Sequence, residues 1–346
     1  MRKALTDKQT RILEAVVTSH ISTGAPVGSS YLCRRSGIGL CSASVRQSMS
    51  ELESMGLLSK PHVSAGRIPT EAGYRLYVGR FAKPYRLTGS EARAITTASS
   101  STVSVGDALE RVSRLLESLS HMTSVALTPE MPGGRITRFE TRKVSKRVLL
   151  ATIAVEPGEV RTFSLTVGPA ASVERATKLL GRLAGVVVGR AAGDAARALS
   201  SVGPEDDDLA DTAGNLKRWL ARVVGGVGQG AYVFGVGNIV PEIKDPGAAR
   251  SVLRVFESRN AVARAILGGM RPSGVTVTIG SDNRSEPMKS FSVVRSPYWV
   301  GRARGAIGLV GPLRMEYSRL ITLIDFASRQ LTSCLSDQGG RRQSAN

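Results

Sequence analysis

The chain has 346 residues, 42% of them apolar, which is enough for two or three domains with packed cores and excludes a wholly disordered chain. No apolar run approaches the roughly 20 residues that a membrane-spanning helix needs, and the N-terminus MRKALTDKQT lacks the apolar segment of a secretory signal. The three cysteines, Cys33, Cys41 and Cys334, show no CxxC spacing, which argues against a disulfide framework or a zinc site. We therefore expect a cytoplasmic protein without membrane association, metal or other cofactor.

The formal net charge of +19 favours a polyanionic partner such as nucleic acid. Arginine outnumbers lysine 37 to 10, a bias that GC-rich codon usage would also produce. Residues 1–90 hold 13 basic but only 5 acidic side chains, so the N-terminal part is distinguished by its lack of acids. Charge alone leaves nucleic-acid binding and a solubility or codon-usage effect both open.

The first eighty residues predict three helices joined by short turns. Thr6 and Gln9 have the spacing of a capping box, which opens the first helix. The second helix is expected to begin around Ser29 and the third near Cys41–Ser42. Glycine-containing turns end the three helices, at residues 24–26, 37–39 and 56. Three helices with a turn of this kind before the third is the plan of a helix-turn-helix domain.

The third helix has one apolar and one polar face. At about 100° per residue, its apolar side chains at 45, 49 and 52 fall together. The opposite face carries Ala43, Arg46, Gln47 and Ser50. Arginine suits guanine O6 and N7, glutamine suits adenine N6 and N7, alanine a thymine methyl, and serine a base or a phosphate. A recognition helix for the DNA major groove is one interpretation of this face, and an ordinary solvated face is the other.

A short β-hairpin is expected directly after this helix. Residues 57–60 form its first strand, 64–66 its turn, and Arg67-Ile68 its second strand, which Pro69 ends. A hairpin in this position is the wing of a winged helix, and its polar side chains suit phosphates or a narrow minor groove. The expected DNA-contacting residues are Ser42, Ala43, Ser44, Arg46, Gln47, Ser50, Lys60, His62, Ser64 and Arg67. The stripe Tyr74, Tyr77, Val78 and Phe81 is expected to pack within the domain or against a second subunit.

The rest of the chain predicts an α+β domain with a helical insertion. The next segment is Ser/Thr-rich and is taken as a linker, although SEARAI at 90–95 is also compatible with the start of a short helix. After it, helices are expected over 107–122, 172–228 and 248–267 and at the C-terminal end, and strands at 148–155, 162–167, 275–279, 291–294 and 306–310. The expected divisions are 1–84 for the winged helix, 85–106 for the linker, 107–170 and 229–338 for the α+β domain, 171–228 for the insertion and 339–346 for a disordered tail.

The sequence gives little support to an enzyme. His20, His62 and His121 show no metal-ligand spacing, and no nucleophile elbow or P-loop is present. The glycines of GGVGQG at 225–230 do not match GxGxxG and favour flexible turns, and the acidic loop at 204–208 favours a solvated surface over a cation site. Binding of NAD, ATP or a stoichiometric metal would revive the enzyme hypothesis.

A second basic cluster lies in the middle of the chain. Its members are Arg135, Arg138, Arg142, Lys143, Lys146 and Arg147. Charges on a sheet edge discourage pairing with other strands, which is the simplest interpretation. An extended DNA footprint and contact with an acidic chaperone surface are the alternatives.

Five segments of the chain carry a resemblance to a known family. The most specific is KPHVSAGRIPTEAGYRLYV at 60–78. The others are LTDKQTRILEAVVTSHISTGAPVGSSYL at 5–32, GLCSASVRQSMSELESMGLL at 39–58, YVFGVGNIVPE at 232–242 and IGLVGPLRMEYSRLITLIDFASRQL at 307–331. Together these segments resemble the bacterial heat-inducible transcription repressor family, HrcA, and the resemblance extends over almost the whole chain.

This resemblance implies a winged-helix DNA-binding domain, then a GAF-like α+β domain interrupted by a helical dimerisation insertion. It also implies a homodimer without catalytic activity that binds the CIRCE inverted repeat in double-stranded DNA and represses chaperonin operons. The chaperonin GroEL supports the active repressor in this family, so unfolded protein that occupies GroEL relieves repression. A regulatory ligand for the GAF-like domain is a variant of this hypothesis.

The sequence departs from the family pattern at the start of the third helix. The family has Ser-Ser/Pro-Ala-Thr followed by Ile-Arg-Asn, where this chain has Cys41-Ser42-Ala43-Ser44 followed by Val45-Arg46-Gln47. Cysteine is a weaker N-cap than serine, so either the helix begins less firmly or Ser42 takes over the cap. Gln47 keeps the amide of asparagine and is one methylene longer. We therefore expect a base preference that differs from the family consensus, with Arg46 as the main specificity residue.

Overall fold

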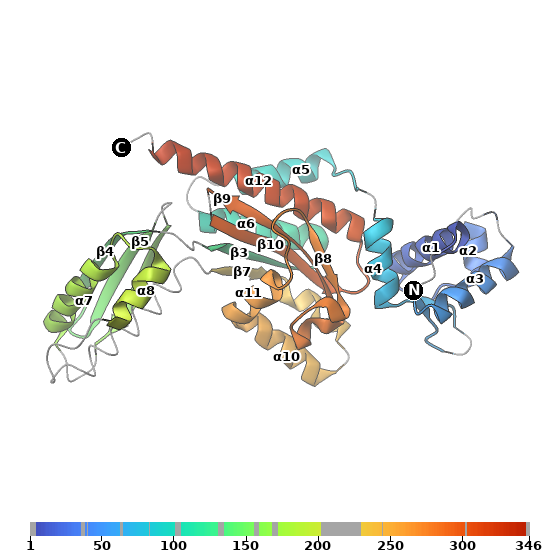
Figure 1. The fold of residues 1–346 in the computed structure, drawn as a ribbon, viewed down its shortest axis with the longest axis horizontal. Coiled ribbons are helices and arrows are strands. Elements are labelled where there is room, and N and C mark those ends of the chain that lie inside the picture. The colour runs from blue at the N-terminus through green and yellow to red at the C-terminus, as the bar shows by residue number, and fades with distance from the viewer. Residues whose placement is uncertain are drawn as a thin grey trace.

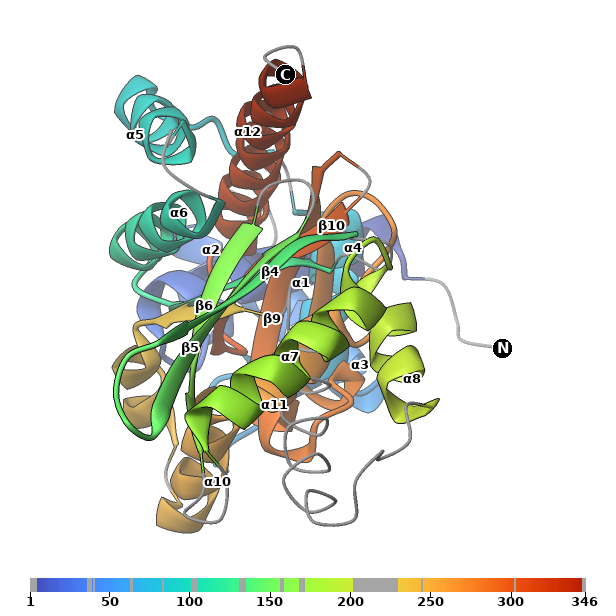
Figure 2. The ribbon, with the colours of Figure 1, turned by 90° about the vertical axis from the view of Figure 1, so that its left-hand side faces the viewer.

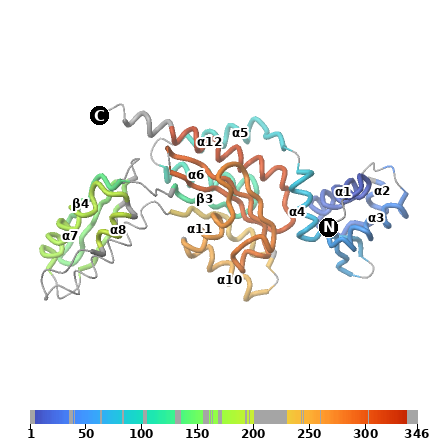
Figure 3. Tube along the Cα trace, in the orientation of Figure 1, coloured from blue at the N-terminus to red at the C-terminus, as the bar shows by residue number. Residues whose placement is uncertain are grey.

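The computed structural model describes three parts of the chain, which are visible in Figure 1. The head comprises residues 5–82, the core comprises 84–130 together with 230–337, and the inserted unit comprises 135–201. The head and the inserted unit lie at opposite ends of the core (Figures 1 and 3). The structure describes the residues from 5 to 343 except for 36–38, 40, 63–64, 83, 101–104, 131–134, 156–158, 168–171, 202–229, 244 and 302.

The head contains the three helices and the hairpin expected from the sequence. These are α1 (Asp7–Thr23), α2 (Ser29–Arg35), α3 (Ser42–Ser54), the antiparallel strands β1 (Leu58–Ser59) and β2 (Ile68–Pro69), and then α4 (Glu71–Arg80). The capping box is formed as expected, because Thr6 Oγ1 accepts from the Gln9 amide at 3.2 Å and Gln9 Oε1 accepts from the Thr6 amide at 3.0 Å. Gly24 ends α1 in the left-handed conformation that glycine adopts readily.

The core is built on a five-stranded antiparallel sheet of order β7-β3-β10-β9-β8. Its strands are β3 (Thr123–Glu130), β7 (Ala231–Phe234), β8 (Thr276–Ile279), β9 (Phe291–Val300) and β10 (Ala303–Pro312). Helices cover both faces. On one face lie α5 (Gly89–Ser99), α6 (Val105–Ser120) and α12 (Tyr317–Gln343), and on the other lie α10 (Pro246–Glu257) and α11 (Arg259–Leu267).

The alternation of side chains along the strands explains the two helical layers. In β10, Ile307 and Leu309 pack toward α6 and α12, whereas Ala306 and Val310 pack toward α10 and α11. A strand that is apolar on both faces has to be covered on both sides. No described helix combines the length and the apolar character needed to cross a lipid bilayer.

The inserted unit has its own sheet, which changes the expected division of the chain. Strands β4 (Ile136–Lys143), β5 (Val148–Val155) and β6 (Glu159–Thr166) pair only with one another among the described residues, in the order β4-β5-β6. Helix α7 (Val173–Val187) packs on this sheet and α8 (Ala192–Ser201) packs beside α7 (Figure 2). The strands expected at 148–155 and 162–167 in the α+β domain thus belong to the inserted unit, whereas β3 belongs to the core. The described insertion begins before β4 rather than at 171, and residues 202–228 lie outside the described part.

Three further segments differ from the sequence-based expectation. The stretch expected as a linker contains α5, in which Thr88 and Glu91 form a second capping box and Ile95 is fully buried. The helix expected over 248–267 is two helices, because Ser258 caps α11. The expected disordered tail from 339 continues helix α12 as far as Gln343.

Arg295 is the largest side chain that is completely buried in the core. Its guanidinium donates from Nη1 to the carbonyl of Ala265 at 3.1 Å and from Nη2 to that of Gly268 at 2.7 Å, at the end of α11. Burial, with the charge of Arg284, lowers the pKa of Arg295 to about 10. The cation thus satisfies carbonyl groups at the negative end of the helix dipole.

We predict that Gly305→Ala destabilises the core. A Cβ at residue 305 would lie 2.2–2.5 Å from the ring and hydroxyl of Tyr298, which is fully buried and donates to the Leu127 carbonyl. Overpacking of this kind costs about 1–3 kcal/mol of unfolding free energy, measurable by urea denaturation. Gly79→Ala is the control, since its Cβ would meet no atom within 4 Å. Equal midpoints for the two variants would contradict the prediction.

We also predict an acid-sensitive contribution to stability from His20. Its Nδ1 lies 2.7 Å from the Tyr74 hydroxyl, and burial together with the Arg314 charge lowers the pKa of His20. The unfolded chain therefore takes up this proton first, and stability present above about pH 6.5 is lost as the pH falls through that value. Melting temperatures from pH 8 to 5 should fall more steeply for the wild type than for His20→Gln. If the melting temperatures of the two proteins fell equally with pH, His20 would not contribute to the acid sensitivity.

Candidate nucleic-acid interface

Helix α3 is fixed in the head by its apolar face and by serine contacts at its start. Val45, Met49 and Leu52 are buried in the head. Cys41 is the N-cap residue and makes no side-chain hydrogen bond to the helix, while the hydroxyl of Ser42 lies 3.1 Å from that of Ser29 on α2. The start of α3 is thus attached to α2, and the cap that a serine at 41 would supply is missing.

The opposite side of α3 is exposed, as the angular spacing indicates. Ala43, Arg46, Gln47 and Ser50 are exposed, and Ser42 and Ser44 are half-buried. Arg46 has no hydrogen bond or ion pair to any residue that the structure describes. Its guanidinium is therefore available to an external acceptor.

Unlike Arg46, Gln47 already has a hydrogen-bond partner within the head, which the sequence pattern did not indicate. Its Nε2 donates to Glu51 Oε1 at 3.2 Å, one helical turn further along α3. The other oxygen of Glu51 accepts from Gln9 Nε2 at 2.8 Å, which ties the carboxylate to α1. An adenine contact by Gln47 would have to compete with this anchored carboxylate.

The hairpin packs closely on the loop between α1 and α2. Arg67 and Val27 exchange two backbone hydrogen bonds of 2.9 Å. A Cβ at Gly66 would lie 2.4 Å from the Val27 carbonyl oxygen, so only glycine permits this approach. Lys60 and His62 are exposed at the hairpin, whereas Ser64 lies outside the described residues.

Arg67 is half-buried and forms an ion pair with helix α3. Its Nη2 lies 2.8 Å from the carboxylate of Glu53 on α3, and its Nε is buried without a hydrogen-bond partner among the described residues. The sequence suggested a phosphate or minor-groove contact for Arg67. The geometry instead directs its guanidinium to Glu53, where it joins the hairpin to α3.

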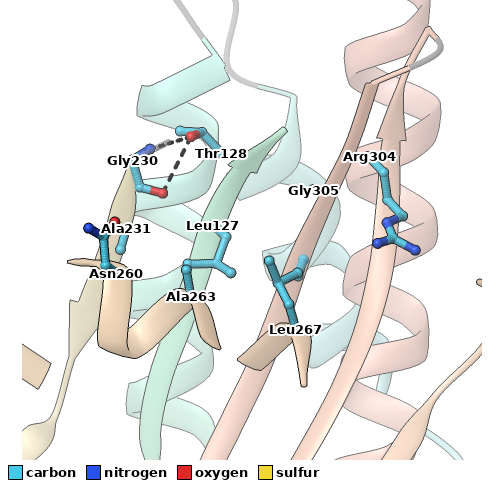
Figure 4. Close-up of a pocket in the computed structure, with 10 residues that line it drawn as sticks. Leu127, Thr128, Gly230, Ala231, Asn260, Ala263, Leu267, Arg304 and Gly305 are labelled. Carbon is cyan, nitrogen blue, oxygen red and sulfur yellow. Dashed lines mark hydrogen bonds between the residues drawn. The ribbon is translucent and has the colours of Figure 1, made fainter. Parts of the chain in front are cut away.

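A separate hollow in the core bears on the small-ligand hypothesis. It lies between α11 and the strands β3, β7 and β10, is partly open to solvent, and has free space for about one or two water molecules (Figure 4). Its walls are mainly apolar, from side chains such as Leu127 and Leu267, with Asn260 and Arg304 as polar groups. At one end the Thr128 amide donates to the Gly230 carbonyl, and the Gly230 amide donates to the Thr128 hydroxyl, which satisfies these polar atoms. No three His, Cys, Asp or Glu side chains of the described residues are grouped as metal ligands.

A family model and individual curated relatives point to the same protein family. A family model described as the HrcA protein C terminal domain matches residues 106–321. The heat-inducible transcription repressor HrcA of Rhodococcus jostii (strain RHA1) is 30% identical over 342 residues, covering 96% of this chain and 99% of the relative. That of Mycolicibacterium smegmatis is 31% identical over 317 residues, covering 90% and 92%.

A solved structure has the same fold. It is a crystal structure described as that of a hypothetical protein, with a TM-score of 0.65 and 22% sequence identity. The similarity covers 97% of this chain and 100% of the other. The arrangement of head, core and inserted unit is therefore also found in an experimental structure.

We predict that the Arg67–Glu53 pair stabilises the hairpin against α3. Glu53→Ala should lower the unfolding free energy of the head by about 0.5–1 kcal/mol, because both groups are partly buried and the pair joins two elements. The measurement is a double-mutant cycle with Arg67→Ala, followed by urea denaturation. Glu53→Ala should add little once Arg67 is absent, and a full additional loss would contradict a direct interaction.

Proposed function

The chain belongs to the HrcA family of heat-inducible transcription repressors, and from that premise we propose that it represses heat-shock operons by binding a CIRCE-type inverted repeat as a homodimer. Membership of a repressor family implies that the chain binds DNA. The finer proposal concerns the operator, the dimer and the residues that contact each half-site. It assigns the protein no catalytic step, and it places the repressor in the cytoplasm, at the nucleoid when bound to the operator.

The observation that carries the proposal is the unoccupied polar face of α3 beside the hairpin. The free guanidinium of Arg46 lies on this face, and the exposed Lys60 lies on the hairpin. A guanidinium binds guanine O6 and N7 in two hydrogen bonds, and a lysine neutralises a phosphate. Arg46 is proposed to read a base pair, and Lys60 to hold the backbone. The other proposed contacts come from Ser42, Ala43, Ser44, Gln47, Ser50, His62 and Ser64, with Arg67 supporting the hairpin.

The symmetry of the operator supports a dimer. Two copies related by a twofold axis present two identical heads in opposite directions, which matches two half-sites of an inverted repeat. Single DNA-binding modules bury roughly 600–1,000 Å², at the low end of specific protein–DNA interfaces, so a second head on the same duplex would increase the affinity. A pair of heads on one duplex supplies the remaining affinity.

The proposed regulation follows from the family. GroEL supports the repressor in its active form, and heat stress occupies GroEL with unfolded protein. Repression is then relieved without a change in the operator. GroEL therefore forms one arm of the test below.

We predict that Arg46→Ala lowers affinity for the inverted repeat by about 1–3 kcal/mol and relaxes preference at one base pair in each half-site. The measurement is fluorescence anisotropy with the inverted repeat and a scrambled duplex, at two salt concentrations, with and without GroEL. Lys60→Ala is the matched control, because loss of a phosphate contact should weaken both duplexes equally and reduce the salt dependence.

Two outcomes would overturn parts of the proposal. A folded Arg46→Ala protein with unchanged affinity would remove Arg46 from the base contacts. Equal, salt-sensitive binding of both duplexes by the wild type, with GroEL present, would reduce the head to a non-specific basic module.

A further inference from the structure

The head is attached to the core through a cluster of directional polar contacts that the DNA interface does not use. We call it the α4 junction and define it as Glu71 and Arg75 on α4 with Ser281 and Asp282 on the core. Ser281 and Asp282 belong to the short 3-10 helix η4 (Gly280–Asp282), which directly follows β8. The cluster therefore connects the head to the central sheet.

Arg75 makes four hydrogen bonds in this junction. Its Nε donates to Asp282 Oδ2 at 2.7 Å, and its Nη2 donates to the Ile279 carbonyl at 3.0 Å and to Ser281 Oγ at 2.6 Å. The fourth bond, also from Nη2, goes to Glu71 Oε2 at 2.7 Å. Three acceptors of one guanidinium thus lie on the core and one on α4.

Glu71 makes the reverse contact from the head to the core. Its Oε2 accepts from the Ser281 amide at 3.0 Å and from Ser281 Oγ at 2.7 Å. Burial opposes ionisation of Glu71, but these bonds and the charge of Arg75 outweigh it and lower the pKa of Glu71. The carboxylate is therefore charged at neutral pH and can hold both partners.

The backbone of the core is shaped to admit this carboxylate. Gly280 has a φ of +59°, and a Cβ there would lie 2.2–2.6 Å from the Glu71 carboxylate. The positive φ favours glycine at this position, and a side chain there would displace the Glu71 carboxylate from the junction. The junction is thus part of the close fit between α4 and η4.

The remaining contacts between head and core are of two kinds. Tyr74 packs on Tyr317 with ring centroids 6.0 Å apart, and Arg314 Nη1 donates to the Ile21 carbonyl at 3.2 Å. The aromatic contact is maintained by burial and ring packing, and the Arg314 bond is single. Among the described residues that join head and core, only the α4 junction combines several charge-assisted hydrogen bonds from one planar guanidinium, which fix an angle as well as a distance.

The position of α4 makes this angle relevant to DNA. Helix α4 lies between the core and the rest of the head, and α3 lies on the far side (Figure 1). A small rotation at α4 therefore moves the exposed face of α3 by a larger distance. An inverted repeat requires the two recognition helices to face the same side of the duplex at one separation, with about 10–10.5 bp per helical turn.

We propose that Arg75 is a positioning residue for DNA recognition: the α4 junction holds each head at one angle to the core and thereby sets the spacing at which a dimer reads two half-sites. This inference rests on the proposed function, since it concerns how the same α3 face is presented. Arg75 itself touches no DNA in this proposal. Its effect is confined to duplexes that engage both heads at once.

The DNA test compares the affinities for duplexes that differ in the distance between the two half-sites. Duplexes carry a single half-site, the inverted repeat, or the inverted repeat with its spacer lengthened by about 5 bp, which turns the second half-site to the opposite side of the helix. The wild type should bind the lengthened repeat at least about tenfold more weakly than the native one. Arg75→Ala should reduce this ratio to about twofold, mainly by weakening the native repeat, and leave the single half-site unchanged.

Three variants control for folding and charge. Arg80→Ala removes an exposed arginine from the same helix, where no ion pair to a described residue is lost, and should behave as the wild type. Asp282→Ala breaks the junction from the core and should reproduce Arg75→Ala. The double variant should show no further loss. Circular dichroism and thermal melting establish that each variant is folded.

A second measurement reports the angle without DNA. Spin labels are placed on the native Cys41 of the head and on Ser290→Cys of the core, two exposed positions, in a background with Cys33→Ser and Cys334→Ser. Labelled chains are diluted with unlabelled ones, and distances within one chain are measured by double electron–electron resonance. The distribution should be narrow for the wild type and Arg80→Ala, and broad for Arg75→Ala and Asp282→Ala.

The outcomes separate this inference from the proposed function. Unchanged spacing ratios or unchanged distance distributions in both junction variants would overturn the role of Arg75. A wild type that binds no inverted repeat would refute the proposed function and, with it, any role of Arg75 in spacing. The distance distributions would then decide only whether the junction fixes the head.

Discussion

The contact between Tyr74 and Tyr317 is the interaction on which the arrangement of the molecule depends. Both rings are almost fully buried, with 2% and 1% of their surface exposed, and they join the apolar cluster of the head to that of the core. Each hydroxyl has a partner, His20 for Tyr74 and the Leu313 carbonyl for Tyr317, so neither ring carries an unsatisfied polar atom into the interface. Because the apolar cluster is continuous, separation of the head from the core would expose aromatic surface to water. The polar contacts around the rings add direction to an attachment that burial already favours.

The topology of the sheet explains how the core accepts an insertion of about 100 residues. The inserted unit leaves the core after β3 and returns at β7, and these strands are antiparallel neighbours in which Leu127 pairs with Ala231. The two ends of the insertion are therefore adjacent in space, and the cost of closing a loop grows only slowly with its length. The inserted sheet buries its own apolar residues, such as Leu149 against Leu180 and Val173, and needs no surface from the core sheet. The core can thus fold around β3 and β7 whatever the length of the connection.

Sequence reasoning was most successful where local signals decide the structure. The capping box at Thr6, the glycine after α1 and the angular spacing of α3 depend on neighbours within a few residues, and the structure has all of them as expected. The expected boundary of the insertion differs from the structure because β5 and β9 are both apolar strands, and the sequence of neither strand indicates which strands it pairs with. The sequence pattern also did not predict that the carboxylate of Glu51 is anchored beside the exposed face of α3, because its hydrogen bond to Gln9 joins residues 42 positions apart. Helix α5 had a detectable signal, since Thr88 and Glu91 have capping-box spacing, but its serines and threonines favoured a linker.

The contacts of α3 bear on the DNA recognition that is proposed for this helix. The family pattern places serine where this chain has Cys41, so the first turn of α3 lacks a side-chain cap and depends on the contact of Ser42 with Ser29. Gln47, with its longer side chain, reaches Glu51, which is itself fixed by Gln9. A base that binds Gln47 has to replace that hydrogen bond, so the net gain from this contact is smaller than for a side chain that is free in solution. Arg46 has no such competitor among the described residues. Under the proposed function, we therefore expect discrimination by this helix to be concentrated on the base pair that Arg46 faces, and more variation to be tolerated at the position assigned to Gln47.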